Sequence, residues 1–231
     1  MRPRKDRPAR PGRRRLLGAS AAAIATQMAW VRRALAAGSL EKGVYRVRGD
    51  VRINGNPARE GMDLHAGDVI TTGPNGELVF VAGKDAFMVR ANSRVELEGA
   101  AGALVLAGLR IVTGAVLSVF TPGTPKTIST ATASVGIRGT GVYVEAEETR
   151  TYACVCYGEA ELAAAGDPSA RELVRTSHHE QPRYIMASGA PMMLMMAPVI
   201  NHTDAELFLL NGLIGRRPPF ADMPGYERYR Y

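Results

Sequence analysis

Residues 130–145 restrict the fold of this chain more than any other stretch, because apolar and polar residues alternate along it. A second alternating run, residues 151–158, follows a short polar turn at residues 147–150. Alternation with a period of two residues indicates β-strands, and two such runs across a short turn indicate an antiparallel hairpin. We therefore expect the protein to be organised around a hairpin over residues 130–158.

Three glycines interrupt the first run and bracket Arg138 and Thr140. Gly136, Gly139 and Gly141 lie inside a strand, where glycine is typical of a bulge or of a backbone that another group approaches closely. Their spacing does not match the phosphate-binding loops that join a strand to a helix. We interpret Arg138, Gly139 and Thr140 as a structural motif.

The guanidinium group of Arg138 has five donors in a fixed geometry. This geometry suits it to hold loop carbonyl groups or a buried carboxylate such as Asp50 or Asp68. Binding of a carboxylate ligand is the alternative for the same side chain. We expect the structural role.

Short alternating segments separated by glycine continue through most of the chain, which is typical of an all-β protein. The segments are residues 44–53, 69–72, 78–81, 87–90, 94–97, 104–106 and 111–120. We expect about twelve short antiparallel strands in a sandwich or a coiled β-roll, because so many short strands bury their apolar faces only against another sheet. Turn residues predict hairpins at residues 74–76 and 83–85.

One C-terminal α-helix is predicted over residues 204–214. Thr203 and Glu206 have the spacing of a capping box, apolar residues follow them, and a Pro-Pro pair at residues 218–219 prevents the helix from continuing.

Four methionines lie between two prolines ahead of this helix: Met192, Met193, Met195 and Met196. Thioether sulfur can bind copper(I), but methionine also fills irregular gaps in apolar packing. We expect the segment to pack over the β-body, with copper binding as the alternative.

Five stretches form a recognisable set: residues 49–51, 64–73, 76–80 and 109–116, and the glycine-containing run 132–144 with the hairpin that ends at Gly158. Together they resemble the FecR-like periplasmic domain family, over about residues 45–162. The resemblance implies a β-domain outside the cytoplasm. It also implies a non-enzymatic binding or sensory module in envelope signalling or assembly, with another envelope protein as its partner.

In the best-known members of that family, a cytoplasmic segment holds a sigma factor, one helix crosses the membrane, and the periplasmic part receives a signal from an outer-membrane iron-siderophore transporter. This chain departs from that plan, because only about fifteen residues precede its apolar leader run. We expect an export signal in residues 1–37, a FecR-like β-domain in residues 38–187, and an appended Met- and Pro-rich segment with the helix in residues 188–231.

The net charge of +7 is distributed unevenly along the 231 residues. Residues 1–37 contain ten of the 29 basic residues and one of the 22 acidic residues, so the rest of the chain has nineteen basic and twenty-one acidic residues. A protein without a basic surface lacks the electrostatic attraction to phosphate on which nucleic-acid binding depends. We therefore expect no nucleic-acid partner.

The leader has the three parts of a cleavable export signal. A basic region ends in three arginines at residues 13–15, a weakly apolar run covers residues 16–30, and an Ala-Leu-Ala sequence lies at residues 34–36. The arginines resemble the twin-arginine signal, whose route exports folded proteins. An uncleaved signal anchor is the alternative, but a membrane span needs about 20 apolar residues. We expect the mature protein in the periplasm, attached to a membrane only if the signal is retained.

Cys154 and Cys156 are the two cysteines of the chain and lie one residue apart on a predicted strand. Alternation places both side chains on one face, with Cα atoms about 6.6 Å apart. A disulfide needs Cβ atoms about 3.8 Å apart, so we expect two thiols. Three roles are open: apolar packing, metal binding, and redox chemistry, for which the usual Cys-x-x-Cys spacing is missing.

A metal site would combine the two thiolates with imidazole from His178 or His179. This set of sulfur and nitrogen donors suits one zinc, iron or copper ion. Consecutive histidines on an extended chain point to opposite faces, so only one would meet the cysteines easily. A turn at residues 177–180 would bring both inward, and the fourth ligand would be water, His202 or none. For His202, which precedes the predicted helix cap, a hydrogen-bonding role is the alternative.

The sequence contains no recognisable Ser-His-Asp set, phosphate-binding glycine loop or paired-carboxylate arrangement. We therefore expect no enzymatic activity. The sequence predicts a non-enzymatic periplasmic module that binds or senses a partner, and a periplasmic metal-binding protein is the alternative.

Overall fold

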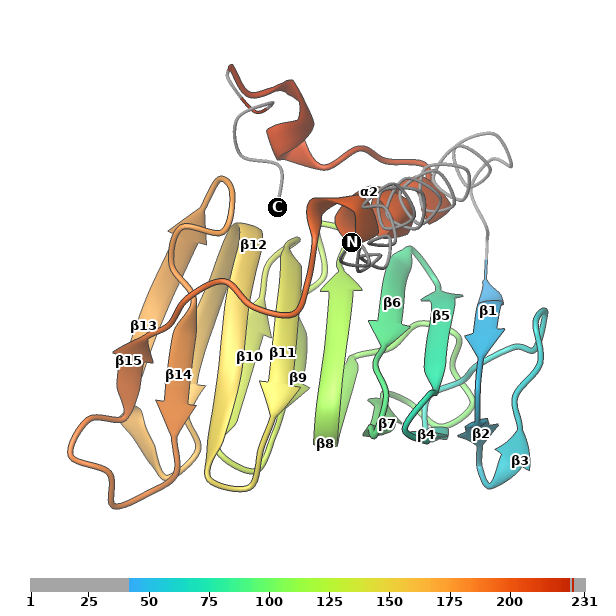
Figure 1. Cartoon of the computed structure of the whole chain (residues 1–231), viewed down its shortest axis with the longest axis horizontal. Coiled ribbons are helices and arrows are strands. Elements are labelled where there is room, and N and C mark those ends of the chain that lie inside the picture. Colours follow the sequence, from blue (N-terminus) through green and yellow to red (C-terminus); the bar gives the residue numbers. More distant parts are fainter. Residues whose placement is uncertain (1–41, 225, 227–231) are drawn as a thin grey trace, which may run out of the picture.

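The computed structural model describes residues 42–224 and 226 (Figure 1). Strands make up about half of this part of the chain, and its one α-helix lies near the C-terminus. The all-β class with a C-terminal helix, expected from the sequence, is confirmed. The predicted export signal, residues 1–37, lies outside the described residues. None of the helices in the described part is long and apolar enough to cross a membrane.

The described residues form fifteen strands. Their bounds are β1 (Gly43–Arg48), β2 (Val51–Ile53), β3 (Asn56–Pro57), β4 (Val69–Thr72), β5 (Glu77–Ala82), β6 (Asp85–Val89), β7 (Arg94–Glu98), β8 (Gly108–Val119), β9 (Lys126–Ser129), β10 (Ala133–Ile137), β11 (Gly141–Ala146), β12 (Arg150–Ala164), β13 (Asp167–Thr176), β14 (Arg183–Met186) and β15 (Leu194–Met196). The α-helix α2 (Asp204–Leu213) and the 3-10 helix η2 (Pro219–Asp222) follow.

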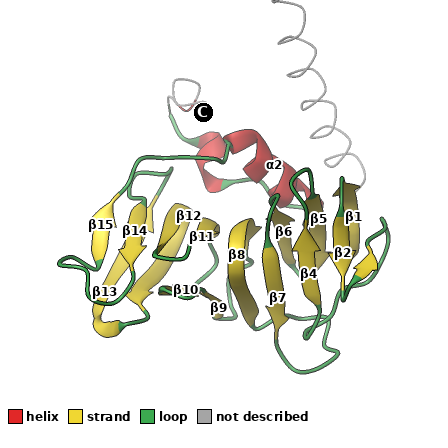
Figure 2. Cartoon of the chain, turned by 60° about the horizontal axis from the view of Figure 1, so that its bottom comes forward, coloured by secondary structure: helices red, strands yellow, loops and turns green. Residues whose placement is uncertain are grey.

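The strands form two layers that share their two longest members. Sheet A has the order β15-β14-β12-β11-β8-β6-β5-β1, and sheet B has the order β13-β12-β10-β9-β8-β7-β4-β2-β3. All pairs are antiparallel except β8 with β9. Because β8 and β12 run through both layers, the two sheets fold against each other as a sandwich (Figure 2).

The glycine-containing stretch is a corner between the two layers. It forms two strands, with β10 in sheet B and β11 in sheet A. Gly139 has a φ of +85°, and a Cβ atom there would lie 2.6 Å from the Cα atom of Pro122, so only glycine fits. On the partner strand Gly158 has a φ of +92°, and Thr140 Oγ1 donates a hydrogen bond of 2.6 Å to the carbonyl oxygen of Glu159. The chain therefore passes between sheet B and sheet A at Gly139 on one side of the hairpin and at Gly158, opposite it, on the other.

The partners expected for Arg138 in this motif, Asp50 or Asp68, are wrong. Its side chain is 72% exposed, and its Nε lies 4.0 Å from Glu159 Oε1. Asp68 accepts a backbone N–H within its own loop, and Asp50 lies on the surface. The reason is strand alternation: Ile137 faces the space between the sheets, so the following residue faces solvent.

Two turn predictions had different outcomes. Residues 83–84 join β5 to β6 as an antiparallel hairpin, as expected. Residues 73–76 join β4 in sheet B to β5 in sheet A, so the hairpin expected at residues 74–76 is wrong. Gly73 donates its backbone N–H to the carbonyl oxygen of Asp50 at 2.8 Å, so this turn packs on the loop between β1 and β2 and crosses between layers.

One predicted strand is missing. Residues 104–106 form a loop, in which Leu106 is buried and its carbonyl oxygen accepts a hydrogen bond from the ammonium group of Lys126. The side chain of Leu106 therefore contributes to the core without a strand ladder around it.

Two apolar cores lie on opposite faces of sheet A. The inter-sheet core, between sheets A and B, includes Val44, Leu78, Phe80, Phe87, Leu97, Ile111, Val144, Ala153 and Val155. The helix-side core, between sheet A and the C-terminal residues, includes Val79, Val81, Met88, Leu117, Tyr143, Tyr152, Cys154, Cys156, Tyr157, Leu207, Leu210, Leu213 and Phe220. Alternation along the strands of sheet A sends neighbouring residues into different cores.

Helix α2 begins where the capping box predicts. Thr203 is the N-cap residue, and its backbone N–H donates to Glu206 Oε2 at 2.9 Å. The helix packs on β6 and β8 and covers part of the outer face of sheet A (Figure 2).

The methionine segment lies farther from this helix, at an edge of sheet A. Met192, Met195 and Met196 are 60%, 42% and 78% exposed, so the packing expected for them is wrong. Met193 is the member that packs against the inter-sheet core. The exposure follows from the position of β15, which pairs on one side with β14 and forms the last strand of the sheet.

Candidate metal centre

Strand β12 carries both thiols on the outer face of sheet A. Cys154 and Cys156 are 0% exposed, and both belong to the helix-side core. A β-bulge lies beside them, because Gly141 pairs with Tyr157 while Val142 pairs with Val155, which leaves Cys156 as the extra residue. Their placement on one face, expected from alternation, is confirmed, and both are free cysteines.

The segment after β13 turns His179 toward the thiols. Glu180 Oε2 accepts the backbone N–H groups of Ser177 at 2.8 Å and His178 at 3.0 Å, which holds a turn at residues 177–180. Such a turn was the alternative to an extended chain, but it brings only His179 to the thiols, not both histidines. His179 has a φ of +59°, an uncommon backbone conformation for a residue other than glycine. Its backbone N–H donates to the carbonyl oxygen of Cys156 at 3.0 Å. The strained backbone and this hydrogen bond together place the ring beside β12.

His202 approaches from the other side, on the residues that lead into α2. Its Nδ1 lies 2.6 Å from the carbonyl oxygen of Ile200, and its Nε2 lies 3.0 Å from Nδ1 of His179. The ring stacks on Tyr143, with centroids 4.7 Å apart. Asn201, the preceding residue, has a φ of +57°, and this turn directs His202 into the core.

Four donor atoms of this site converge on one point. One ligand atom each from Cys154, Cys156, His179 and His202 lie within 4.8 Å of one another. Cys154 Sγ is 3.5 Å from His179 Nδ1. Around a tetrahedral zinc ion with bonds of about 2.3 Å to sulfur and 2.0–2.1 Å to nitrogen, neighbouring donors lie about 3.3–3.8 Å apart. The spacing of these donors is close to that of a tetrahedral shell.

The hydrogen bonds of the two imidazoles fix which nitrogen faces the thiols. The carbonyl oxygen of Ile200 only accepts, so His202 Nδ1 carries a hydrogen and Nε2 carries a lone pair. Asp204 Oδ1 lies 3.1 Å from His179 Nε2, so Nε2 carries a hydrogen and Nδ1 a lone pair. The two lone pairs then face each other across 3.0 Å. A proton or a metal ion between them is needed to make this arrangement favourable.

Asp204 orients the histidines from behind. Its carboxylate accepts hydrogen bonds from His178 Nε2 at 2.9 Å and from Tyr226 Oη at 3.0 Å, in addition to His179. Burial raises the pKa of Asp204, but the hydrogen bonds from the two histidines outweigh it and hold the pKa below its usual value. An ionised carboxylate behind a metal-binding histidine fixes the ring orientation and strengthens the ligand.

The pKa shifts of the thiols favour a partly ionised site. The hydrogen bond from Cys156 lowers the pKa of Cys154 despite burial, and His179 and His202 lower it further. Burial raises the pKa of Cys156. Burial lowers the pKa of His179, but Asp204 and Cys154 outweigh it and raise this pKa to about 9. These pKa shifts favour a proton on His179 beside the Cys154 sulfur, and a metal ion at this position would take the place of that proton.

The structure brings together three of the four residues proposed as ligands from the sequence: Cys154, Cys156 and His179. His178 instead turns its Nε2 to Asp204 and is grouped with Asp204 and His179 alone. His202, expected either as a fourth ligand or as a hydrogen-bonding residue, lies in the ligand position. In the sequence, His202 directly precedes the capping box, and this position predicts that it lies at the start of α2.

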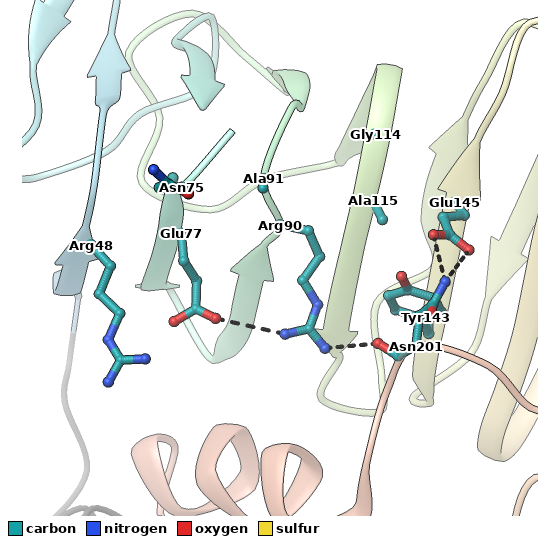
Figure 3. Close-up of a pocket in the computed structure, with 11 residues that line it drawn as sticks. Arg48, Asn75, Glu77, Arg90, Ala91, Gly114, Ala115, Tyr143, Glu145 and Asn201 are labelled. Carbon is teal, nitrogen blue, oxygen red and sulfur yellow. Dashed lines mark hydrogen bonds and ion pairs between the residues drawn. The ribbon is translucent and has the colours of Figure 1, made fainter. Parts of the chain in front are cut away.

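A pocket of about 480 Å³, whose lining residues are drawn in Figure 3, includes the Tyr143 ring that stacks on His202. Its charged groups hold the turn that carries His202. Arg90 makes two bonds of 2.8 Å to Glu206 and donates to the carbonyl oxygen of Asn201 at 3.1 Å. Glu145 accepts from the Asn201 side-chain amide at 3.0 Å. Tyr143 forms a wall of the pocket and stacks on His202 with its ring, so the pocket and the donor cluster share a side chain.

The fold and the donor cluster define an all-β protein with a buried set of two cysteines and two histidines. No family model and no curated protein matches the chain. Two crystal structures of a putative anti-sigma factor from Parabacteroides distasonis ATCC 8503, at 2.50 Å and 1.65 Å resolution, are similar at 12% sequence identity and a TM-score of 0.44. The match covers 55% of this chain and 59% of that chain, less than two thirds of its length.

Proposed function

We propose that this protein binds one transition metal ion, zinc in the first place, through Cys154, Cys156, His179 and His202. The observation that carries the proposal is the pair of imidazole nitrogens that face each other at 3.0 Å beside two buried thiols. Tetrahedral sets of two sulfur and two nitrogen donors are typical of structural zinc sites.

A closed set of four donors favours a structural role over a catalytic one. Catalytic zinc sites keep one coordination position open for water or substrate, whereas structural sites use all four for protein ligands. The donors here come from β12, from the turn after β13 and from the residues before α2. A bound ion would therefore join three separate parts of the chain, and we propose a non-enzymatic role for it.

The wider function that we propose is that of an exported FecR-like module that engages another envelope protein. The motif resemblance over residues 45–162 and the leader at residues 1–37 support this proposal. Export of the folded protein would allow the metal to be inserted before transport. Cell fractionation with mass spectrometry of the mature N-terminus tests it: a periplasmic chain that starts near residue 38 is expected, and a cytoplasmic chain with an intact N-terminus would contradict it.

Metal analysis of the purified protein tests the site directly. We expect about one zinc ion per wild-type chain, and none in Cys154→Ser or His202→Ala, because each substitution removes one of four ligands. His65→Ala is the matched control, since His65 lies in a loop outside the cluster and its loss should leave the zinc content unchanged. Wild-type protein that is folded and stays metal-free after zinc is added would refute the proposal.

A further inference from the structure

We infer that the metal ion controls whether the C-terminal residues stay seated on sheet A. This inference rests on the proposed metal site and adds a regulatory consequence to it. We call residues 197–224 the cover segment. It includes α2 and η2, and it supplies the outer half of the helix-side core.

The ligands belong to two parts of the molecule. Cys154 and Cys156 lie on β12 and His179 follows β13, so all three are part of the β-body. His202 belongs to the cover segment and lies two residues before the first residue of α2. A bound ion would therefore join the N-terminal end of this helix to the sheet.

Helix α2 has only ten residues. Isolated helices shorter than about 12–15 residues are marginal in water, so α2 depends on its contacts with the sheet. Leu207, Leu210 and Leu213 are buried against the outer face of sheet A. Beyond these apolar contacts, the Arg90–Glu206 pair and the bonds of Asp204 to His178 and His179 anchor the helix to the β-body. The ion would attach His202, four residues before Glu206, to the β-body as well.

Removal of the ion changes what the closed cover buries. With an ion present, each of the four donor atoms coordinates the metal. Without it, the thiols and imidazoles in the closed cover keep only weaker hydrogen bonds to one another, such as His202 Nε2 with His179 Nδ1 at 3.0 Å and Cys154 Sγ with His179 Nδ1 at 3.5 Å. These bonds stabilise the closed cover less than four bonds to a metal ion would. Opening of the cover returns the four donors to water, so loss of the ion favours the open state.

The converse coupling follows from burial. His179 and His202 are 4% and 5% exposed and the two cysteines 0%, so an ion cannot enter or leave while the cover is closed. Metal exchange therefore requires the cover to open. Zinc binding and closure of the cover favour each other, and thermodynamic linkage makes the two effects on the equilibrium constants equal. The inter-sheet core lies on the opposite face of sheet A, so the β-body can stay folded while the cover opens.

Hydrogen exchange on the full-length protein, with zinc and after its removal by a chelator, tests this inference. We expect backbone amides of α2 to exchange about tenfold faster or more without zinc, and amides of β8 and β10 to be unchanged. Equal protection of α2 in both states, in protein shown to bind zinc, would overturn the inference and leave the proposed function intact. Loss of protection in β8 and β10 as well would also overturn it, because the cover would then not be a separate unit.

A variant that leaves every donor in place tests the coupling in reverse. Leu210→Ala removes a buried contact of α2, and zinc should transfer to a chelating dye about tenfold faster from this variant than from wild type. Leu97→Ala is the matched control, because Leu97 is equally apolar and buried but belongs to the inter-sheet core. Equal release rates from the two variants would contradict the inference. Absence of bound zinc in the wild type would instead refute the proposed function, so the two failures are distinguishable.

Discussion

The two cores of this protein differ in composition although they share the strands of sheet A. The inter-sheet core consists of aliphatic residues and phenylalanines, whereas the helix-side core adds tyrosines and both cysteines. Strand β12 shows the contrast within one element, because Ala153 and Val155 face the first core and Cys154 and Cys156 the second. The first core needs only apolar volume to hold the sandwich together. The second encloses polar groups that need specific partners, so we place the function there.

The largest expected effect is loss of zinc binding without loss of the β-sheets, which would separate the helix-side core from the inter-sheet core. Cys156→Ser should abolish stoichiometric zinc binding, because a neutral hydroxyl replaces one of two thiolate ligands. The β-sheet content should remain, since the side chain does not enter the inter-sheet core. Metal content and circular dichroism measure the two quantities on the same sample. Zinc retained at wild-type affinity would show that Cys156 is not a ligand.

The next effect concerns the inter-sheet core. Phe87 is fully buried there and stacks on Phe80, with ring centroids 4.8 Å apart. Phe87→Ala should lower the free energy of global unfolding by about 3–5 kcal/mol, as measured by chemical denaturation. The zinc content of the folded fraction should not change. Loss of zinc from folded Phe87→Ala would show that the two cores are not independent.

The ion pair of the cover segment gives a pH-dependent effect. Burial raises the pKa of Glu206, but Arg90 outweighs it and holds the pKa below its usual 4.5. A carboxylate with a lowered pKa stabilises the folded state above its usual pKa, and this contribution is lost as the pH falls through the folded-state value. Glu206→Gln should therefore cost about 1.5–3 kcal/mol at pH 7, and its difference from wild type should shrink as the pH falls from 4.5 through the lowered folded-state pKa of Glu206.

Thermal unfolding of wild type and Glu206→Gln at each pH measures this difference, and any effect of metal loss at low pH is common to both. Glu172→Gln is a suitable control, because Glu172 forms a similar pair with Arg183 on the β-body, at the surface. A pH-independent difference between wild type and Glu206→Gln would contradict the role assigned to the carboxylate.

The smallest expected effect lies behind the ligands. Asp204→Asn keeps one accepting oxygen but loses the charge that faces His178 and His179, so zinc affinity should fall about 10- to 100-fold. Competition with a chelator of known affinity measures this change. Asp222→Asn is the control, since Asp222 is exposed and pairs with Arg217 away from the cluster. Equal affinities in both variants would mean that Asp204 does not support the site.

Sequence patterns predicted what depends on neighbouring residues. Alternation gave the all-β class and placed Cys154 and Cys156 on one face, and the capping box gave the start of α2. Sequence patterns did not show to which sheet the strand after a turn belongs. The turn at residues 73–76, which crosses from sheet B to sheet A, was therefore predicted as a hairpin. The exposed Arg138 was misjudged because a donor count carries no information about which way a strand residue faces.

The donor cluster was only partly predictable, because local patterns do not show which distant segments pack together. Cys154, Cys156 and His179 were proposed as ligands from the sequence, and a turn at residues 177–180 was one of the two chain paths considered for the histidines. His202 reaches the site because α2 packs back onto β6 and β8, and no local pattern encodes that return. Its selection over His178 depends on the left-handed backbone at His179, which directs that ring to the thiols and leaves His178 to Asp204.

X-ray absorption at the zinc edge of the purified wild-type protein tests the central claim most directly. The account predicts a shell of two sulfur atoms at about 2.3 Å and two nitrogen atoms at about 2.0–2.1 Å. A shell of oxygen and nitrogen alone, or folded protein that binds no metal, would contradict it.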